Sequence, residues 1–174
     1  MKALLICGPS GSGKSTFVRQ LIRQYPDRYI KAVQYTTRPR RDGEAENEYM
    51  FVTPDEFKKV HSSLVGITHV NGNVYGSKIS FDEEKIQIFI LNKEGISDFQ
   101  YMAMSFKDAE VKTLGVYRDL EKCCEARASR DREFIKEEFK TLSLANAIFQ
   151  NVTEEITPET ISDLNEVIKK LFGE

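Results

Sequence analysis

The chain has 174 residues, of which 40% are hydrophobic and 30% charged, a composition typical of a folded globular domain rather than a disordered chain. Its 25 basic and 27 acidic side chains leave a net charge of −2, which provides no general attraction for nucleic acid or an anionic membrane. Three cysteines cannot form a disulfide framework, and no apolar run resembles a signal peptide or a membrane span. We therefore expect a cytoplasmic protein that binds neither nucleic acid nor membrane.

Strand-like and helix-like patterns alternate along most of the chain. Short apolar runs predict buried strands, at residues 3–7, 30–35, 86–91, 111–116 and 147–152. Amphipathic patterns between these runs predict helices, at residues 15–25, 93–104, 120–128, 134–144 and 157–171. This order of elements is typical of an α/β fold with a doubly wound, mostly parallel sheet.

The segment 37–80 interrupts the alternation with short β segments, at residues 49–52, 64–70 and 73–78. Thr53-Pro54-Asp55-Glu56 predicts the start of one helix, because it combines a cap, a proline at the first helical position and a capping-box glutamate. Asn71-Gly72 is a strong signal for a tight hairpin turn. We expect a small β-rich insertion on the α/β core.

The strongest motif is Gly8-Pro9-Ser10-Gly11-Ser12-Gly13-Lys14-Ser15, which matches GxxxxGK[ST] and lies between a predicted strand and a predicted helix. In such a loop the backbone N–H groups converge on phosphate oxygens, and the helix N-terminus adds a positive dipole end. We expect ATP to bind at Gly8, Ser10, Gly11, Ser12, Gly13, Lys14, Ser15 and Thr16. Lys14 would reach the β- and γ-phosphates, and Ser15 would ligate Mg²⁺. The alternative is a tight glycine turn with a solvated lysine.

Three arginines within four positions, Arg38, Arg40 and Arg41, open the insertion. A planar guanidinium suits two-pronged recognition of phosphate, so a pair facing the phosphate loop could hold a second, phosphorylated substrate. Tyr49, Tyr75 and Ser77 would add hydroxyl groups to this site. The alternative is a solvated run of charge in a loop.

At this point the chain resembles the guanylate kinase family over nearly its whole length. The segments that carry the resemblance are 8–16, 25–28, 36–44, 49–52, 72–77 and 150–151. The resemblance implies a P-loop core (1–36, 81–119 and 145–174), an NMP-binding insertion (37–80) and a helical lid (120–144) in a single domain. It also implies that Arg38, Arg41, Tyr49 and Tyr75 hold the phosphate of GMP, that Glu44 orients the arginines, and that Ser77 lies near the nucleotide.

Two base-reading carboxylates of the family are absent from this chain. The family glutamate falls at Gly66, the family aspartate at Asn92, and a serine that also contacts guanine falls near Gln34 or Tyr35. We expect Asn92 still to contact a base, because its amide offers both a donor and an acceptor, but with weaker selection for guanine. Ile90 also stands where the family has an acidic residue, so Ser15 would hold Mg²⁺ with phosphates and water alone.

The lid segment contains Arg127, Arg130 and Arg132. Arg127 aligns with a lid arginine of the family, and we expect it to act with Lys14 on the charge of the transferring phosphoryl group. Two further lid arginines of the family are replaced, by Cys123 and near Glu138. For Arg130 and Arg132 the alternative is a salt-bridge cluster with Asp131 and Glu133.

The resemblance therefore implies an ATP-dependent nucleoside monophosphate kinase that converts GMP to GDP, working as a monomer or homodimer on small-molecule nucleotides. Two alternatives remain open on the sequence. One is a kinase for a different mononucleotide, since the phosphate-binding residues match better than the base-reading ones. The other is a guanylate kinase-like nucleotide- or partner-binding module with little or no turnover.

Overall fold

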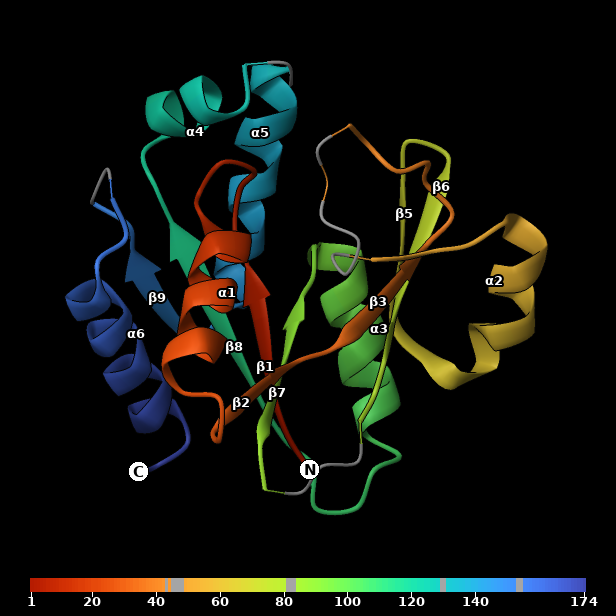
Figure 1. The fold of residues 1–174 in the computed structure, drawn as a ribbon, viewed down its shortest axis with the longest axis horizontal. Helices are drawn as coiled ribbons and strands as arrows, with labels where there is room; N and C mark the ends of the chain where they lie inside the picture. Colours follow the sequence, from red (N-terminus) through yellow and green to blue (C-terminus); the bar gives the residue numbers. More distant parts are fainter. Residues whose placement is uncertain (43, 45–48, 81–83, 129–130, 153–154) are drawn as a thin grey trace.

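The computed structural model describes residues 1–174 except 43, 45–48, 81–83, 129–130 and 153–154. Two sheets lie side by side in the described chain (Figure 1). The core sheet has five strands, in the order β2 (Tyr29–Lys31), β7 (Ile86–Ile90), β1 (Lys2–Cys7), β8 (Glu110–Tyr117) and β9 (Ala147–Gln150). Every neighbouring pair in this sheet is parallel, which confirms the expected α/β architecture.

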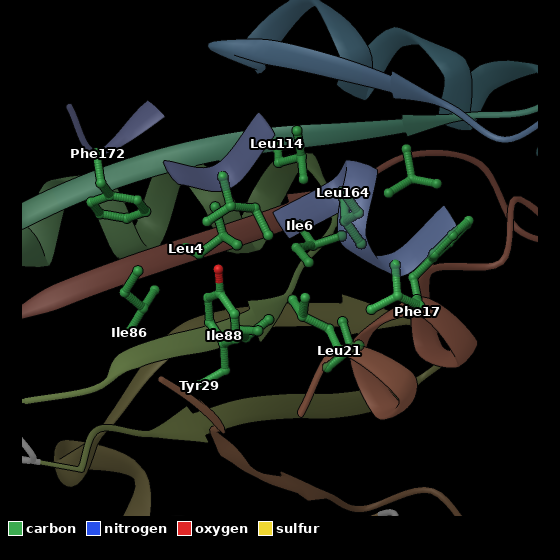
Figure 2. Packing of buried hydrophobic residues seen from close by; sticks show 14 residues of the cluster. Leu4, Ile6, Phe17, Leu21, Tyr29, Ile86, Ile88, Leu114, Leu164 and Phe172 are labelled. Atoms are coloured by element: carbon green, nitrogen blue, oxygen red, sulfur yellow. The ribbon is translucent and has the colours of Figure 1, made fainter. Parts of the chain in front are cut away.

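Helices cover both faces of the core sheet. On one face α1 (Lys14–Gln24) and α6 (Pro158–Leu171) pack against alternate residues of β1, among them Leu4 and Ile6. Figure 2 shows these two side chains among Phe17, Leu21 and Leu164. The intervening β1 residues face α3 (Lys93–Ala103), through its buried Ile96 and Phe99. Since each fully buried side chain of this size contributes about 1.5–3 kcal/mol, both layers hold β1 at the centre of the molecule.

The second sheet has the order β4 (Met50–Phe51), β3 (Val33–Thr36), β6 (Asn73–Lys78) and β5 (Leu64–Val70). Between β4 and β5 lie α2 (Pro54–Val60) and the short 3-10 helix η1 (His61–Ser63). Thr53 and Glu56 form the expected capping box at the start of α2. Asn71 and Gly72 take positive φ angles of 50° and 76° in the turn between β5 and β6. The local signals in this insertion are thus confirmed.

The single strand expected at 30–35 is wrong, because the chain changes sheets within it. β2 pairs with β7 in the core sheet, and β3 pairs with β6 in the second sheet. Between them, the buried Ala32 donates its N–H to the Ile88 carbonyl at 2.9 Å. The second sheet therefore begins before residue 37, where the insertion was expected to start.

The segment 120–144, where a lid was expected, contains α4 (Leu120–Ala126), α5 (Arg132–Glu138) and the 3-10 helix η2 (Phe139–Leu144). One continuous helix was expected over 134–144, but it tightens after Glu138. The Thr141 hydroxyl donates to the Glu138 carbonyl at 2.7 Å, a local bond that competes with the regular helical ladder. In Figure 1, α4 and α5 lie beyond the carboxyl ends of β1 and β8.

All three cysteines are free, with Cys7 and Cys123 buried and Cys124 half-buried. Outside the gaps in the described chain, no group of three His, Cys, Asp or Glu side chains is placed to hold a metal ion. Among the described helices, none is both long enough and apolar enough to cross a bilayer.

Candidate active site

The phosphate-binding loop (residues 8–15) joins the carboxyl end of β1 to the start of α1. At Gly11 the loop passes so close to the lid that a Cβ atom would lie 2.5 Å from the Cys123 carbonyl oxygen. On the other side, the buried Asn151 side chain donates to the Ser12 carbonyl at 3.0 Å. The loop is thus fixed between α4 and the residue that follows β9.

Lys14 lies within the loop rather than reaching out of it. Its Nζ donates to the carbonyls of Gly8 and Pro9, both at 2.7 Å. The pKa of Lys14 is lowered to about 8, mainly by burial and to a smaller extent by the positive charge of Arg127. Ser15 and Thr16 follow it at the start of α1 and are exposed. Lys14, Ser15 and Thr16 all line one cleft, although the Lys14 ammonium group is held by the carbonyls of its own loop.

The second predicted cluster is organised by Glu44. The Arg38 guanidinium donates to both carboxylate oxygens of Glu44, at 2.7 and 3.0 Å, and the Arg41 N–H donates to the same carboxylate at 3.2 Å. The hydrogen bonds from Arg38 lower the pKa of Glu44, and those to Glu44 raise the pKa of Arg38. The Arg38 guanidinium also lies 5.4 Å from the ring centre of Tyr49.

Arg41 differs from Arg38 in having its guanidinium available. The Arg41 side chain is exposed, and across the described residues it has no hydrogen-bond or ion-pair partner. Arg40 points elsewhere, because its guanidinium donates to the Glu44 carbonyl at 2.6 and 3.1 Å. Tyr49 and Tyr75 stand edge to face beside this cluster, with ring centres 6.1 Å apart. One arginine is thus held in place, and another is free to meet a ligand.

A single cleft of about 1060 Å³ brings these two clusters together. The predicted residues that line it are Gly8, Ser10, Gly11, Gly13, Lys14, Ser15, Thr16, Arg38, Arg41, Glu44, Tyr49, Tyr75, Asn92 and Arg127. Two predicted residues do not line it. Ser12 is fully buried inside the loop, and Ser77 is fully buried beside Gln34, whose amide nitrogen donates to the Ser77 hydroxyl at 3.4 Å.

One end of the cleft is lined by Gly66, Thr68 and Asn92. Asn92 caps α3, since its Oδ1 accepts hydrogen bonds from the Gly95 N–H at 2.9 Å and the Thr68 hydroxyl at 2.8 Å. This fixes the orientation of the Asn92 amide, and its nitrogen has no partner in the described part of the chain. Asn92 therefore offers the cleft a hydrogen-bond donor where a carboxylate would offer an acceptor.

The lid arginines have different roles in the structure. Arg127 is exposed and lines the cleft. Arg132 forms a two-pronged salt bridge with Glu121 and so connects α5 to α4. Arg132 is thus part of a salt bridge, as the alternative in the sequence analysis has it, but its partner is Glu121 rather than Asp131 or Glu133. Arg130 lies outside the described residues.

Two residues at the loop have no local signal in the sequence. Glu138 accepts hydrogen bonds from the Ser10 N–H at 2.6 Å and from the Ser10 hydroxyl at 3.1 Å. Arg118, which follows β8, donates to the Gly11 carbonyl at 3.2 Å, and its buried Nε has no partner in the described chain. The sequence marks Glu138 only as the replacement of a family arginine, and it gives Arg118 no mark.

Comparison with known proteins places this geometry in a family. The family model for guanylate kinase matches residues 1–171. Guanylate kinase from Schizosaccharomyces pombe is 36% identical over 56% of this chain and 48% of its own length. The enzyme from Nitratidesulfovibrio vulgaris is 33% identical over 76% of this chain and 67% of its own length. The matched parts thus span about half to two thirds of these relatives.

The fold comparison agrees. The crystal structure of guanylate kinase from Anaplasma phagocytophilum superposes with a TM-score of 0.74 at 22% identity, covering 97% of this chain and 85% of that one. At 22% identity this likeness supports the fold alone. The assignment to a family rests on the family model that matches residues 1–171. The chain belongs to the guanylate kinase family.

Proposed function

We propose that this protein transfers the γ-phosphoryl group of ATP to the phosphate of GMP, yielding ADP and GDP. The observation that carries the proposal is the shared cleft. It is lined on one side by the phosphate-binding loop and on the other by Arg38, Arg41, Tyr49 and Tyr75. Two phosphate-recognising clusters that face a common space are what a direct transfer between two nucleotides requires.

The roles of the residues follow from their charge and position. A phosphate oxygen of GMP attacks the γ-phosphorus in line. The bond between the γ-phosphorus and the oxygen that bridges the β- and γ-phosphates breaks, and this oxygen stays on ADP with the bonding electron pair. Lys14 would turn from the carbonyls of Gly8 and Pro9 towards the phosphates. Arg127, exposed at the cleft, would add positive charge around the transferring group. Arg38 and Arg41 would hold the acceptor phosphate.

The family implies a divalent metal, and the oxygen donors at the loop fit Mg²⁺ with few protein ligands. The Ser15 hydroxyl lines the cleft, whereas Ile90 and Asn92 supply no carboxylate at the end of β7. Mg²⁺ keeps several waters and is commonly bound by substrate phosphates with one or two protein oxygens. Ser15 would therefore be the protein ligand. Bound there, the metal would neutralise charge on the phosphates.

We further propose that the insertion 37–80 acts as the acceptor-binding part and that 120–144 acts as the lid over the donor. Arg38 and Arg41 follow β3, Tyr75 lies on β6, and Arg127 follows α4, and these positions beside the cleft support this division. Free thiols at Cys7, Cys123 and Cys124 support a reducing, cytoplasmic compartment.

A second candidate is a kinase for another mononucleotide, and the donor presented by Asn92 favours it. Guanine shows N–H donors at N1 and N2, which an aspartate would accept and the Asn92 amide nitrogen does not. Arg38, Arg41, Tyr49 and Tyr75, by contrast, would bind the phosphate, which is the same in every mononucleotide.

A coupled ADP-release assay across GMP, dGMP, AMP, UMP, CMP and dTMP tests the proposal. We expect turnover with GMP as the best acceptor. A folded Lys14→Ala variant should lose on the order of 10³-fold in activity, since Lys14 is the side-chain cation of the loop. Another base giving the highest rate would identify the second candidate. ATP binding without ADP release for any acceptor would identify a binding module.

A further inference from the structure

The carboxylate of Glu138 occupies the phosphate-binding loop. It accepts two hydrogen bonds from Ser10, one from the backbone N–H at 2.6 Å and one from the hydroxyl at 3.1 Å. Backbone N–H groups of such a loop are the donors that hold nucleotide phosphates. A carboxylate resembles a phosphate in its charge and its acceptor oxygens, so Glu138 sits as an anion on a donor that the nucleotide needs.

The backbone that carries Glu138 is firmly placed. One turn earlier in α5, Ile135 is fully buried. The Glu138 carbonyl accepts the Thr141 hydroxyl at 2.7 Å, and the Thr141 carbonyl in turn accepts the Cys7 thiol at 3.4 Å, where β1 ends. The side chain is therefore delivered to the loop by residues packed against the core sheet. Its three rotatable bonds also allow it to leave without unfolding the helix.

The charges around the loop favour this arrangement when no nucleotide is bound. Lys14 lies half-buried in the same loop, and the negative charge of Glu138 partly offsets the effect of desolvation on the Lys14 pKa. A triphosphate brings several negative charges to the same place, and these would repel a carboxylate that remained there. The loop therefore cannot hold both anions on Ser10.

We infer that Glu138 is an internal competitor of the donor nucleotide, which binds to the loop only after the Glu138 carboxylate has left Ser10. The inference rests on the proposed binding of ATP at this loop. It assigns to Glu138 a direct control over donor affinity. The competing group is the phosphate chain, so the nucleoside has no part in the effect.

Calorimetric binding of Mg–ATP and of Mg–tripolyphosphate to the full chain tests this inference. The variants are Glu138→Ala and Glu138→Gln, which removes the charge at nearly constant shape. The control is Glu133→Ala, on the same helix, where the glutamate is exposed and paired with Lys136. We expect both Glu138 variants to bind Mg–ATP at least about tenfold more tightly, the scale of one charged hydrogen-bonded contact. The control should bind as the unaltered protein does.

The outcomes separate the inference from the proposed function. The same gain with tripolyphosphate, which lacks a nucleoside, supports competition at the phosphate site. Equal or weaker Mg–ATP binding by the folded Glu138→Gln variant overturns the inference while the kinase assignment stands. A failure of every variant and of the unaltered protein to bind Mg–ATP overturns the proposed function, and the inference with it. Circular dichroism of each variant establishes that it is folded.

Discussion

Arg38 and Glu44 form a two-pronged ion pair at the mouth of the insertion, with the side chains only 10% and 15% exposed. The carboxylate of Glu44 also accepts the Arg41 N–H, so one acidic residue fixes the side chain of one arginine and the backbone of another. An arginine whose fork is oriented in advance loses less freedom when it binds phosphate. If Arg38 and Arg41 hold the acceptor as proposed, Glu44 acts on it through them rather than by touching it.

Replacing Glu44 by alanine should weaken binding of the monophosphate. The loss of the charged hydrogen bonds frees Arg38, and we expect the KM for GMP to rise about tenfold or more, with the KM for ATP nearly unchanged. Steady-state kinetics with each substrate varied in turn measures both constants. A parallel rise in the two KM values would mean that Glu44 supports the whole cleft and not the acceptor side.

Arg41 and Arg40 form a matched pair of neighbouring arginines. Arg41 lines the cleft, whereas Arg40 is turned to the Glu44 carbonyl and is absent from the cleft lining. Arg41→Ala should raise the KM for GMP by roughly 30- to 150-fold, the equivalent of about 2–3 kcal/mol of lost charged contact. Arg40→Ala should change it several-fold at most. Similar effects of the two substitutions would contradict direct contact of Arg41 with the phosphate.

Because its pKa is lowered, Lys14 should make the free energy of unfolding depend on pH above about pH 8. Its pKa is about 8 in the folded chain, against 10.5 when it is solvated. Below pH 8 it is charged in both states, and burying that charge opposes folding. Between pH 8 and 10.5, Lys14 is mostly deprotonated in the folded state and still protonated in the unfolded state. The unfolded state therefore binds more protons, and the free energy of unfolding rises with pH.

Denaturant unfolding from pH 7 to 10.5 measures this dependence by difference. Relative to Lys14→Met, the unaltered protein should gain about 1–3 kcal/mol of unfolding free energy across that range. Relative to Lys107→Met, which replaces an exposed lysine, the unaltered protein should show no such gain. Parallel curves for the unaltered protein and Lys14→Met would show that Lys14 titrates as a solvated lysine.

The proposed role of Asn92 in selecting the base depends on whether its side chain offers a donor or an acceptor. Asn92→Asp keeps an oxygen to cap α3 and turns the partnerless donor into an acceptor for the N–H groups of guanine. We expect the preference for GMP over the other monophosphates to be shallow in the unaltered protein and to increase about tenfold or more in Asn92→Asp. The acceptor panel measures the ratios of kcat/KM. A preference above ~10⁴-fold in the unaltered protein would show that another group already reads guanine.

Replacing Gly66 by a larger residue should destabilise the fold. Its φ is 63°, and a Cβ atom would lie 2.9 Å from a methyl group of Leu91. Gly72 also has a positive φ, 76°, but no atom within 4 Å of a Cβ. Gly66→Ala should destabilise the protein by about 2–3 kcal/mol, and Gly72→Ala by about 1–2 kcal/mol, because only the first adds overpacking to backbone strain. Thermal unfolding of the two variants compares them. Equal losses would mean that Leu91 moves aside freely.

Features encoded over a few neighbouring residues could be predicted from the sequence. The phosphate-binding loop follows from the spacing of its glycines and Lys14 between a strand and a helix. The start of α2 follows from Thr53 and Glu56, and the turn after β5 from Asn71-Gly72. The expectation of a second phosphate-recognising cluster follows from the local density of arginines at Arg38, Arg40 and Arg41.

The remaining features depend on contacts between distant residues. Ser10 and Glu138 are 128 positions apart, and Gly11 and Arg118 are 107 positions apart, so no local pattern links either pair. The change of sheet at Ala32 was missed for a similar reason. Residues 30–35 are apolar enough for a single strand, and only the partners of each half, β7 and β6, divide them.

The unequal burial of the three thiols has a practical consequence. Burial raises the pKa of Cys7 and raises that of Cys123 to about 11, whereas Cys124, the next residue in α4, is half-buried. Because alkylating reagents attack the accessible thiolate, we expect Cys124 to react ahead of the other two. The unaltered protein therefore carries its own attachment point for a fluorophore or spin label. A label there would report changes in the surroundings of α4 during turnover without any engineered cysteine.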